Sequence, residues 1–241
     1  KVLLIDADAQ ANLTMALGYN RPDDIPITLS TVMQNIIDDK TLDVSQGIIH
    51  HSEGVDLLPS NIEMSGFEVR LINAMSRERV LKTYVNEVKK NYDYVLIDCM
   101  PSLGMITINA LAAADSVIIP TQPHYLSAKG LELLLRSVSM VKRQINPKLR
   151  IDGILMTMVM PRTNISKEIT ATVKSAYGQK IKVFDTEIPH SIRAVEATAE
   201  GKSIFAYDKS GKVAAAYEQL GKEVAEIGEK QRNQNRDDRI R

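Results

Sequence analysis

The stretch Lys1-Val-Leu-Leu-Ile-Asp6-Ala-Asp8-Ala-Gln10-Ala-Asn12-Leu-Thr14 decides the fold class of this chain. Four consecutive apolar residues followed by a polar cluster are typical of a parallel strand that is buried on both faces. Such a strand ends at the carboxyl edge of a sheet, where open α/β sheets bind their ligands. Asp6 and Asp8 share one face of a continuing strand, and two carboxylates this close repel each other unless a cation or strong donor lies nearby.

This pattern alone also fits a strand that ends in an Asx-type turn. A second strand of the same kind favours the functional interpretation, because Asn91-Tyr-Asp-Tyr-Val-Leu-Ile-Asp98 again ends an apolar run in a carboxylate. An apolar run that ends in aspartate near a phosphate loop is the Walker-B arrangement, in which the carboxylate holds Mg²⁺ beside the phosphates of a nucleotide. The two strands together support a site at this edge of the sheet.

Strand and helix patterns alternate along the rest of the chain. Strands are expected at 116–120, 150–158 and 181–184, and helices at 12–17, 28–37, 62–91 (in two pieces), 127–145, 165–177, 191–200 and 213–230. Asn12 is the expected N-cap of the first helix. The alternation implies a mostly parallel α/β sheet with helices on both faces. We expect one domain over residues 1–229, followed by a charged, disordered tail at 230–241.

The composition is ordinary for a soluble globular protein, with 44% hydrophobic and 25% charged residues. The sequence has no apolar run of transmembrane length, so we expect a cytoplasmic protein without membrane contact. A single cysteine, Cys99, excludes an internal disulfide framework and suits a reducing compartment. The four scattered histidines do not have the spacing of zinc ligands.

The formal net charge of zero is unevenly distributed. Residues 1–120 carry 9 Lys+Arg against 16 Asp+Glu, whereas residues 121–241 carry 21 against 14. The net charge thus changes from −7 in the first half to +7 in the second. A basic half suggests a surface that meets an anion such as nucleic acid, although dispersed lysines on solvated helix faces account for the pattern equally well.

Several motifs resemble the ParA/Soj chromosome- and plasmid-partitioning ATPases, a deviant-Walker P-loop family related to MinD. Residues 2–14 are similar to that family's DxDxQxN segment, and residues 92–104 to its YDxxxIDxPPSLG segment. The match continues through residues 107–115, 119–122, 188–193 and 201–204, so it is collinear from residue 1 to about residue 228. The resemblance implies a P-loop ATPase fold whose first βα unit is missing from these residues, with ATP and Mg²⁺ as cofactors.

The resemblance also implies roles for the three carboxylates. Asp8 matches the residue that positions the attacking water, so its replacement should spare ATP binding and block hydrolysis. Asp6 and Asp98 match the carboxylates that hold Mg²⁺ through water.

Four residues of the second half match other family positions. Pro189 and Ser191 fall where the family contacts adenine, although this chain reads Pro-His-Ser there instead of Pro-Arg-Asn. Arg162 and Arg193 match arginines that bind DNA without sequence preference, in agreement with the basic second half. A surface ion pair is the simpler alternative for each arginine.

The phosphate loop is the main departure from the family. Its lysine-bearing KGGVGKT[ST] segment belongs to the strand and helix just before the position of Lys1, and the 241 residues contain no such loop. Gly201-Lys-Ser203 lacks the upstream glycine. Without the loop's N–H groups and lysines nothing cradles the phosphates, so we expect these residues alone to bind ATP weakly or not at all, and to be inactive.

The resemblance implies a nucleoid-associated homodimer that closes on ATP, binds non-specific DNA, and is released when a ParB/Spo0J-like centromere-binding protein stimulates hydrolysis. The alternatives are a MinD-like membrane-associated regulator and a non-hydrolysing DNA- or partner-binding relative. The MinD-like alternative needs a basic amphipathic C-terminal helix, but Ile240 is the only apolar residue after Lys230. A phosphoacceptor receiver domain also gathers aspartates at strand ends, but it does not explain the later motifs.

Overall fold

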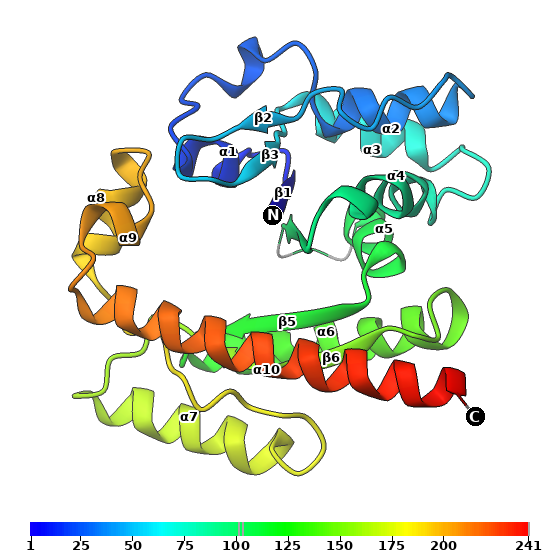
Figure 1. Ribbon diagram of the computed structural model, residues 1–241. Coiled ribbons are helices and arrows are strands. Elements are labelled where there is room, and N and C mark those ends of the chain that lie inside the picture. Colours follow the sequence, from blue (N-terminus) through cyan, green and yellow to red (C-terminus); the bar gives the residue numbers. More distant parts are fainter. Residues whose placement is uncertain (101, 103, 241) are drawn as a thin grey trace. The chain divides into compact units, whose positions relative to one another are not determined.

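The computed structural model describes residues 1–100, 102 and 104–240, and its ribbon is shown in Figure 1. The chain divides into two compact units. The first comprises residues 1–115, 136–149 and 197–203, and the second comprises 116–135, 150–196 and 204–241. The sequence predicts one domain over residues 1–229. The division arises because the strands form two separate sheets, one in each unit.

The sheet of the first unit has the order β2-β3-β1-β4. Its strands are β1 (Val2–Ala7), β2 (Ile49–His50), β3 (Asp56–Leu58) and β4 (Tyr94–Cys99). The central β1 pairs in parallel with both β3 and β4, whereas β2 is antiparallel to β3. The register places Asp6 directly opposite Asp98, so the strands predicted from the two apolar runs end side by side.

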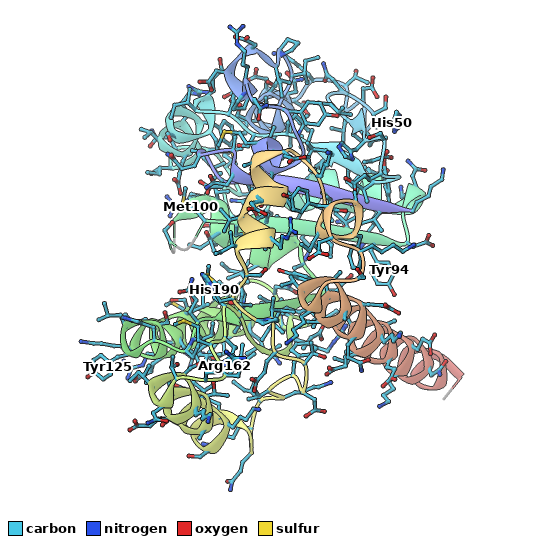
Figure 2. All side chains as sticks on the ribbon, turned by 90° about the vertical axis from the view of Figure 1, so that its left-hand side faces the viewer. His50, Tyr94, Met100, Tyr125, Arg162 and His190 are labelled. Carbon is cyan, nitrogen blue, oxygen red and sulfur yellow. The ribbon has the colours of Figure 1, made fainter. Side chains whose placement is uncertain are left out.

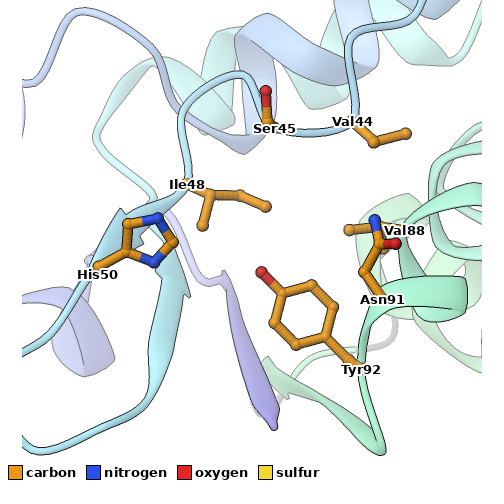
Figure 3. Close-up of a pocket in the computed structure, with 7 residues that line it drawn as sticks. All are labelled: Val44, Ser45, Ile48, His50, Val88, Asn91 and Tyr92. Carbon is orange, nitrogen blue, oxygen red and sulfur yellow. The ribbon is translucent and has the colours of Figure 1, made fainter.

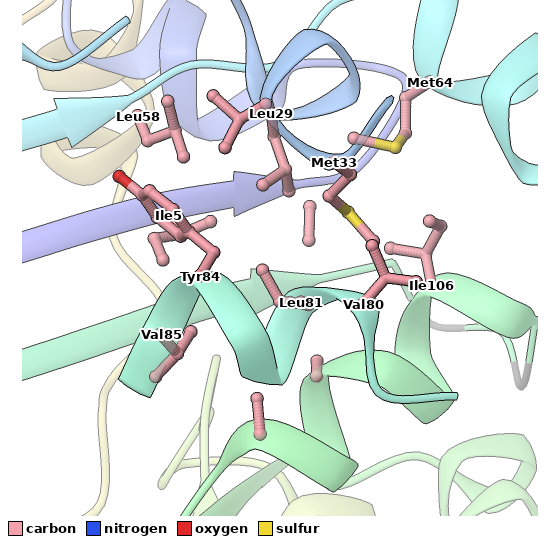
Figure 4. Packing of buried hydrophobic residues seen from close by; sticks show 14 of the residues in the cluster. Ile5, Leu29, Met33, Leu58, Met64, Val80, Leu81, Tyr84, Val85 and Ile106 are labelled. Atoms are coloured by element: carbon pink, nitrogen blue, oxygen red, sulfur yellow. The ribbon is translucent and has the colours of Figure 1, made fainter. Parts of the chain in front are cut away.

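Helices cover one face of this sheet. They are α2 (Leu29–Ile37), α3 (Glu63–Leu71), α4 (Val80–Val88) and α5 (Met105–Ala113). The first unit also contains α1 (Asn12–Ala16) and the short 3-10 turns η1 (Pro22–Asp24) and η2 (Lys89–Asn91). Leu3 and Ile5 of β1 are fully buried against α2, α4 and α5, and Figure 4 shows Tyr84 and Leu81 of α4 beside Ile5. Alternation along the strand explains this, because every second residue enters the core.

The opposite face of β4 is open to solvent. Tyr94 and Leu96 alternate with the core residues Val95 and Ile97, and their side chains are 38% and 54% exposed. Parallel sheets are normally covered on both faces. The apolar run of β4 is therefore typical of a strand buried on both faces, but only one of its faces is buried.

The second unit contains the parallel pair β5 (Ser116–Thr121) and β6 (Arg150–Met156), with a register irregularity after Val117. Its helices are α7 (Asn164–Tyr177), α9 (Ile204–Tyr207) and α10 (Lys212–Ile240), whereas α6 (Tyr125–Gln144) and α8 (Ile192–Ala199) belong partly to each unit. Residues of α6 and α7 pack on one set of strand residues, including Ile119 and Ile154. Residues of α10 pack in a second cluster with Leu155 of β6 and with Phe184. Both faces of the strand pair are therefore covered.

Several predicted elements differ from the observed ones. Asn12 is not the N-cap of α1; Ala11 occupies that position with a left-handed φ of 52°, because the Asn12 amide turns back to Asp8. Residues 181–184 form a single bridge, between Ile154 and Val183, instead of a strand. Helix α10 runs to Ile240, and the disordered tail at 230–241 stays a prediction. None of the helices within the described residues combines the length and apolarity that a membrane crossing requires.

Candidate functional site

Asp6 lies at the end of β1 and holds the start of α1. Its side chain is fully buried, and its Oδ2 accepts hydrogen bonds from the Thr14 backbone N at 2.9 Å and the Thr14 hydroxyl at 2.7 Å. Its Oδ1 accepts the backbone N of Asp8 at 3.1 Å. Because it accepts the backbone N of Thr14 at the start of α1, this carboxylate also interacts favourably with the helix dipole. Burial nevertheless raises the pKa of Asp6, because desolvation outweighs these three donors.

Asp8 organises the turn between β1 and α1. It is 8% exposed; its Oδ1 accepts the backbone N of Gln10 at 2.9 Å, and its Oδ2 accepts the Asn12 side-chain amide at 3.3 Å. The Asx-type turn is therefore present, and the same carboxylates cluster at the sheet edge. The two interpretations of the opening stretch are thus compatible.

Asp98 completes a group of three carboxylates at the carboxyl ends of β1 and β4. Its side chain reaches solvent, yet partial desolvation and then the charges of Asp6 and Asp8 raise its pKa. The adjacent Cys99 thiol lies in the same negative electrostatic environment. Burial and the charges of these three aspartates raise its pKa to about 12. This edge of the sheet is therefore strongly negative and would gain from a cation.

We expect Asp98→Asn to stabilise the first unit at neutral pH. Because the folded pKa is raised above the ordinary 3.8, the unfolded chain releases its proton first as pH rises. The free energy of unfolding therefore falls as pH rises from the unfolded-state pKa of Asp98 to its folded-state pKa. Above both values this loss of stability stays constant. Asparagine removes that penalty, so the gain should be about 0.5 kcal/mol at pH 7 after solvent screening and should vanish near pH 3.

The measurement is urea denaturation of both proteins across this pH range. Asp43→Asn is the control, because hydrogen bonds from Ser45 lower the pKa of Asp43, so its replacement should destabilise the protein at neutral pH. A loss of stability in Asp98→Asn that is equal at pH 3 and pH 7 would exclude carboxylate repulsion.

The predicted adenine residues lie in the second unit, in the extended segment between α7 and α8. The backbone N of Val159 donates to the carbonyl of Ile188 at 3.0 Å, and the backbone N of His190 donates to the carbonyl of Val159 at 3.0 Å. These bonds place Pro189 opposite Val159 in an isolated parallel bridge. The Ser191 hydroxyl accepts the backbone N of Arg193 at 3.2 Å, so it caps the start of α8.

The two predicted DNA-binding arginines are both exposed. Arg193 lies in the first turn of α8, 3.5 Å from Glu196 and 5.8 Å from the ring centre of Tyr207. A hydrogen bond with Tyr207, followed by the charge of Glu196, raises its pKa. Arg162 lies in the turn before α7 and is labelled in Figure 2. Each side chain presents its charge to solvent.

A shallow cavity lies elsewhere in the first unit, near the amino ends of β1 and β4 (Figure 3). The Asp56 carboxylate beside it accepts the Tyr92 hydroxyl at 2.7 Å and lies 2.5 Å from His50 Nδ1. Burial, followed by the hydrogen bond to Asp56, raises the pKa of Tyr92 to about 12. The cavity is lined by Val44, Ser45, Ile48, His50, Val88, Asn91 and Tyr92. It belongs to the opposite end of these strands from the three aspartates.

Thr14 is the site residue that the sequence did not single out. Its hydroxyl donates to Asp6 and also accepts the backbone N of Ser60 at 3.2 Å, so it ties β1, α1 and the end of β3 together. A threonine eight residues after an aspartate is not a recognisable local motif. Pro101 and Leu103, in the second matched motif, lie outside the described residues.

Among the described residues, no group of three or more His, Cys, Asp or Glu side chains is arranged to hold a metal directly. Asp6 has three of its four acceptor positions filled by hydrogen bonds, which leaves one on Oδ1. Asp98 accepts the backbone N of Cys99 and is otherwise open to solvent. The carboxylates therefore fit a hydrated cation better than a directly bound one.

Known proteins resemble this chain over nearly its whole length. A family model described as an AAA domain matches residues 1–151. The sporulation initiation inhibitor protein Soj of Bacillus subtilis is 40% identical over 229 residues, which cover 95% of this chain and 87% of that protein. The chromosome partitioning protein ParA of Myxococcus xanthus is 36% identical over 226 residues, covering 93% and 77%.

Solved structures share the fold. A Mycobacterium smegmatis protein described as cobyrinic acid a,c-diamide synthase, with bound ADP and magnesium, is 33% identical with a TM-score of 0.72, covering 88% of this chain and 84% of that one. Apo McdA of Cyanothece has a TM-score of 0.77 at 23% identity, covering 93% and 87%, and shows the fold alone. The predicted mostly parallel α/β fold of the P-loop type is confirmed. With its two strand-end aspartate motifs side by side and these relatives spanning nearly its whole length, the chain belongs to the ParA/Soj family of partitioning ATPases.

Proposed function

We propose that this chain forms the body of an ATP-driven partitioning protein. ATP closes a homodimer, the dimer binds DNA without sequence preference, and a ParB/Spo0J-like partner stimulates hydrolysis and release. Such a protein works on the nucleoid in the cytoplasm. The observation that carries the proposal is the pairing of Asp6 with Asp98 at one sheet edge, with Asp8 buried beside them.

We assign the three carboxylates different tasks. Asp98 is open to solvent and lies beside Asp6, so it would hold Mg²⁺ through water, with the free position on Asp6 Oδ1 as a second water acceptor. Bound Mg²⁺ would neutralise the phosphate charge of ATP. Asp8 lies in the turn after β1, where it would orient the attacking water. A 33% identical protein with ADP and magnesium supports this choice of ligands.

ATP affinity needs a lysine-bearing phosphate loop as well as these carboxylates. We expect the 241 residues alone to show no micromolar binding of Mg–ATP in isothermal titration calorimetry, because they contain no Gly-rich loop ending in GK[ST]. The same chain with a KGGVGKT-bearing strand and helix placed before Lys1 is the control, and it should bind. Micromolar affinity without the loop would overturn this part of the proposal.

Pro189 and Ser191 are proposed to contact adenine. The backbone bonds from Val159 to residues 188 and 190 hold this segment extended, which keeps Pro189 in place. The Ser191 hydroxyl already accepts a helix N–H, so it would offer adenine its own proton.

Arg162 and Arg193 are proposed to contact DNA phosphates. In the chain that carries the phosphate loop, with a non-hydrolysable ATP analogue, Arg193→Ala should weaken binding to unrelated duplexes by a similar factor and lower the salt slope by about 1. Fluorescence anisotropy over a salt series measures both. Arg21→Ala is the matched control, because Arg21 is also an exposed arginine paired with a carboxylate three residues later. If the two variants had the same DNA affinity and salt slope, we would infer that DNA does not contact α8.

A further inference from the structure

Two glycines make an unusually close backbone contact between the end of α1 and the end of α8. Both have left-handed φ angles, +87° at Gly18 and +65° at Gly201. A Cβ on Gly201 would lie 2.4 Å from Gly18 Cα and 2.8 Å from Gly18 N, closer than real Cβ atoms approach backbone. Since the obstructing atoms are backbone, the contact excludes every residue except glycine at position 201 without a shift of one segment.

The contact connects directly to the aspartate cluster through α1. Asp6 holds Thr14 by two hydrogen bonds, and two residues of the same turn hold the loop that follows. There the Gly18 N donates to the Met15 carbonyl at 2.9 Å, and the Tyr19 N donates to the Thr14 carbonyl at 3.3 Å. A continuous series of hydrogen bonds therefore joins Asp6 to Gly18 within a single helical turn.

A second bond fixes the other side of the same segment. The backbone N of Ser203 donates to Glu53 Oε1 at 2.9 Å, and hydrogen bonds from Ser203 lower the pKa of Glu53. Residues 197–203 are thus held in the first unit at Gly201 and at Ser203. The preceding residues of the segment are the last turn of α8, and Arg193 lies in the first turn of that eight-residue helix.

We propose that the Gly18–Gly201 contact couples the aspartate cluster to the end of α8, the helix that carries Arg193, so that a disturbance at Asp6 or Thr14 reaches residues 197–203. Gly18 and Gly201 are positioning residues in this proposal. Its consequence for DNA rests on the proposed function of Arg193, but the coupling itself does not. Coupling between two sites is reciprocal, so a disturbance at either end must be felt at the other.

Hydrogen exchange on the 241-residue protein tests the coupling without nucleotide or DNA. Gly201→Ala should speed amide exchange in residues 12–19, and Thr14→Val, at the other end, should speed it in residues 197–203, each by about fivefold or more. Gly221→Ala and Thr107→Val are the matched controls. A Cβ on Gly221 meets no atom within 4 Å, and the buried Thr107 hydroxyl has no hydrogen-bond partner within the described part of the chain.

Two variants are used because one of them could fail to fold. The exchange rates of either variant alone are enough to test the coupling. The proposal would be overturned if each variant changed amide exchange only in the segment around its own substitution, and the other segment exchanged as in the controls. In the chain with the phosphate loop, Gly201→Ala should also reduce the ratio of DNA affinities with and without saturating ATP analogue by about fivefold or more. If the wild type binds no DNA, the proposed function fails while the exchange result still decides the coupling.

Discussion

Replacement of Asp8 by alanine should reduce ATP hydrolysis at least about 100-fold in the chain that carries the phosphate loop, while the affinity for ATP changes by less than about threefold. The reason is positional. Asp8 is the first residue after β1, and its carboxylate lies in a buried turn beside two other carboxylates. A group there can orient a water molecule towards a phosphate without itself binding the nucleotide.

The alanine variant also loses two hydrogen bonds that shape the turn, so a second variant separates shape from charge. Asp8→Asn can still accept the backbone N of Gln10, and the Asn12 amide can rotate to face it. We therefore expect Asp8→Asn to keep the stability of the wild type and still lose hydrolysis. Steady-state phosphate release measures the rate, and calorimetry with a non-hydrolysable analogue measures affinity.

Asp24→Ala is a suitable control, because it removes an exposed carboxylate that forms an ion pair with Arg21, three residues earlier. Hydrolysis by Asp8→Asn within a few-fold of the wild type would remove Asp8 from the reaction. A parallel loss of analogue affinity would instead make it a nucleotide ligand.

The sequence predicted the strands of this site well because their signals are local. The apolar runs before Asp6 and Asp98 lie in β1 and β4, and Thr28 begins α2 with a capping box, as the pattern at 28–37 indicates. A run of apolar residues followed by polar ones depends only on neighbouring residues. The same signal could not tell that one face of β4 stays exposed, because that depends on what packs against the strand.

Features that depend on distant residues were missed or wrong. Asn12 has the right side chain for an N-cap, but its Nδ2 donates to Asp8, and Ala11 takes the cap position with a left-handed φ. The bonds from Thr14 to Asp6 and from Ser60 to Thr14 join residues eight and 46 positions apart. The pairing of the strands into two separate sheets is likewise not specified by any pattern within a single strand.

Thr14→Val should lower the free energy of unfolding by about 3 kcal/mol at pH 7. The fully buried hydroxyl donates to the Asp6 carboxylate at 2.7 Å and accepts the backbone N of Ser60 at 3.2 Å. Valine has nearly the same shape but leaves both partners buried without that bond. A hydrogen bond to a charged group contributes about 1.5–3 kcal/mol, and an unpaired buried N–H costs about 1–3 kcal/mol.

Thr107→Val provides the matched control. Thr107 is also buried, but its hydroxyl lacks a hydrogen-bond partner among the described residues, so valine should change stability by less than about 1 kcal/mol or increase it. Urea denaturation of the three proteins at equal m-values gives the comparison. Equal losses in both variants would mean that Thr14 stabilises the fold by packing alone.

The pH dependence of the loss identifies the partner. Thr14 donates to the ionised form of Asp6, and these bonds lower its pKa against the desolvation that raises it. Valine therefore raises the folded pKa of Asp6 further. The difference between wild type and variant should grow as pH rises through the folded pKa values and stay constant above them. A loss at pH 4 that is clearly smaller than at pH 7 assigns the effect to Asp6, whereas a pH-independent loss assigns it to the bond with Ser60.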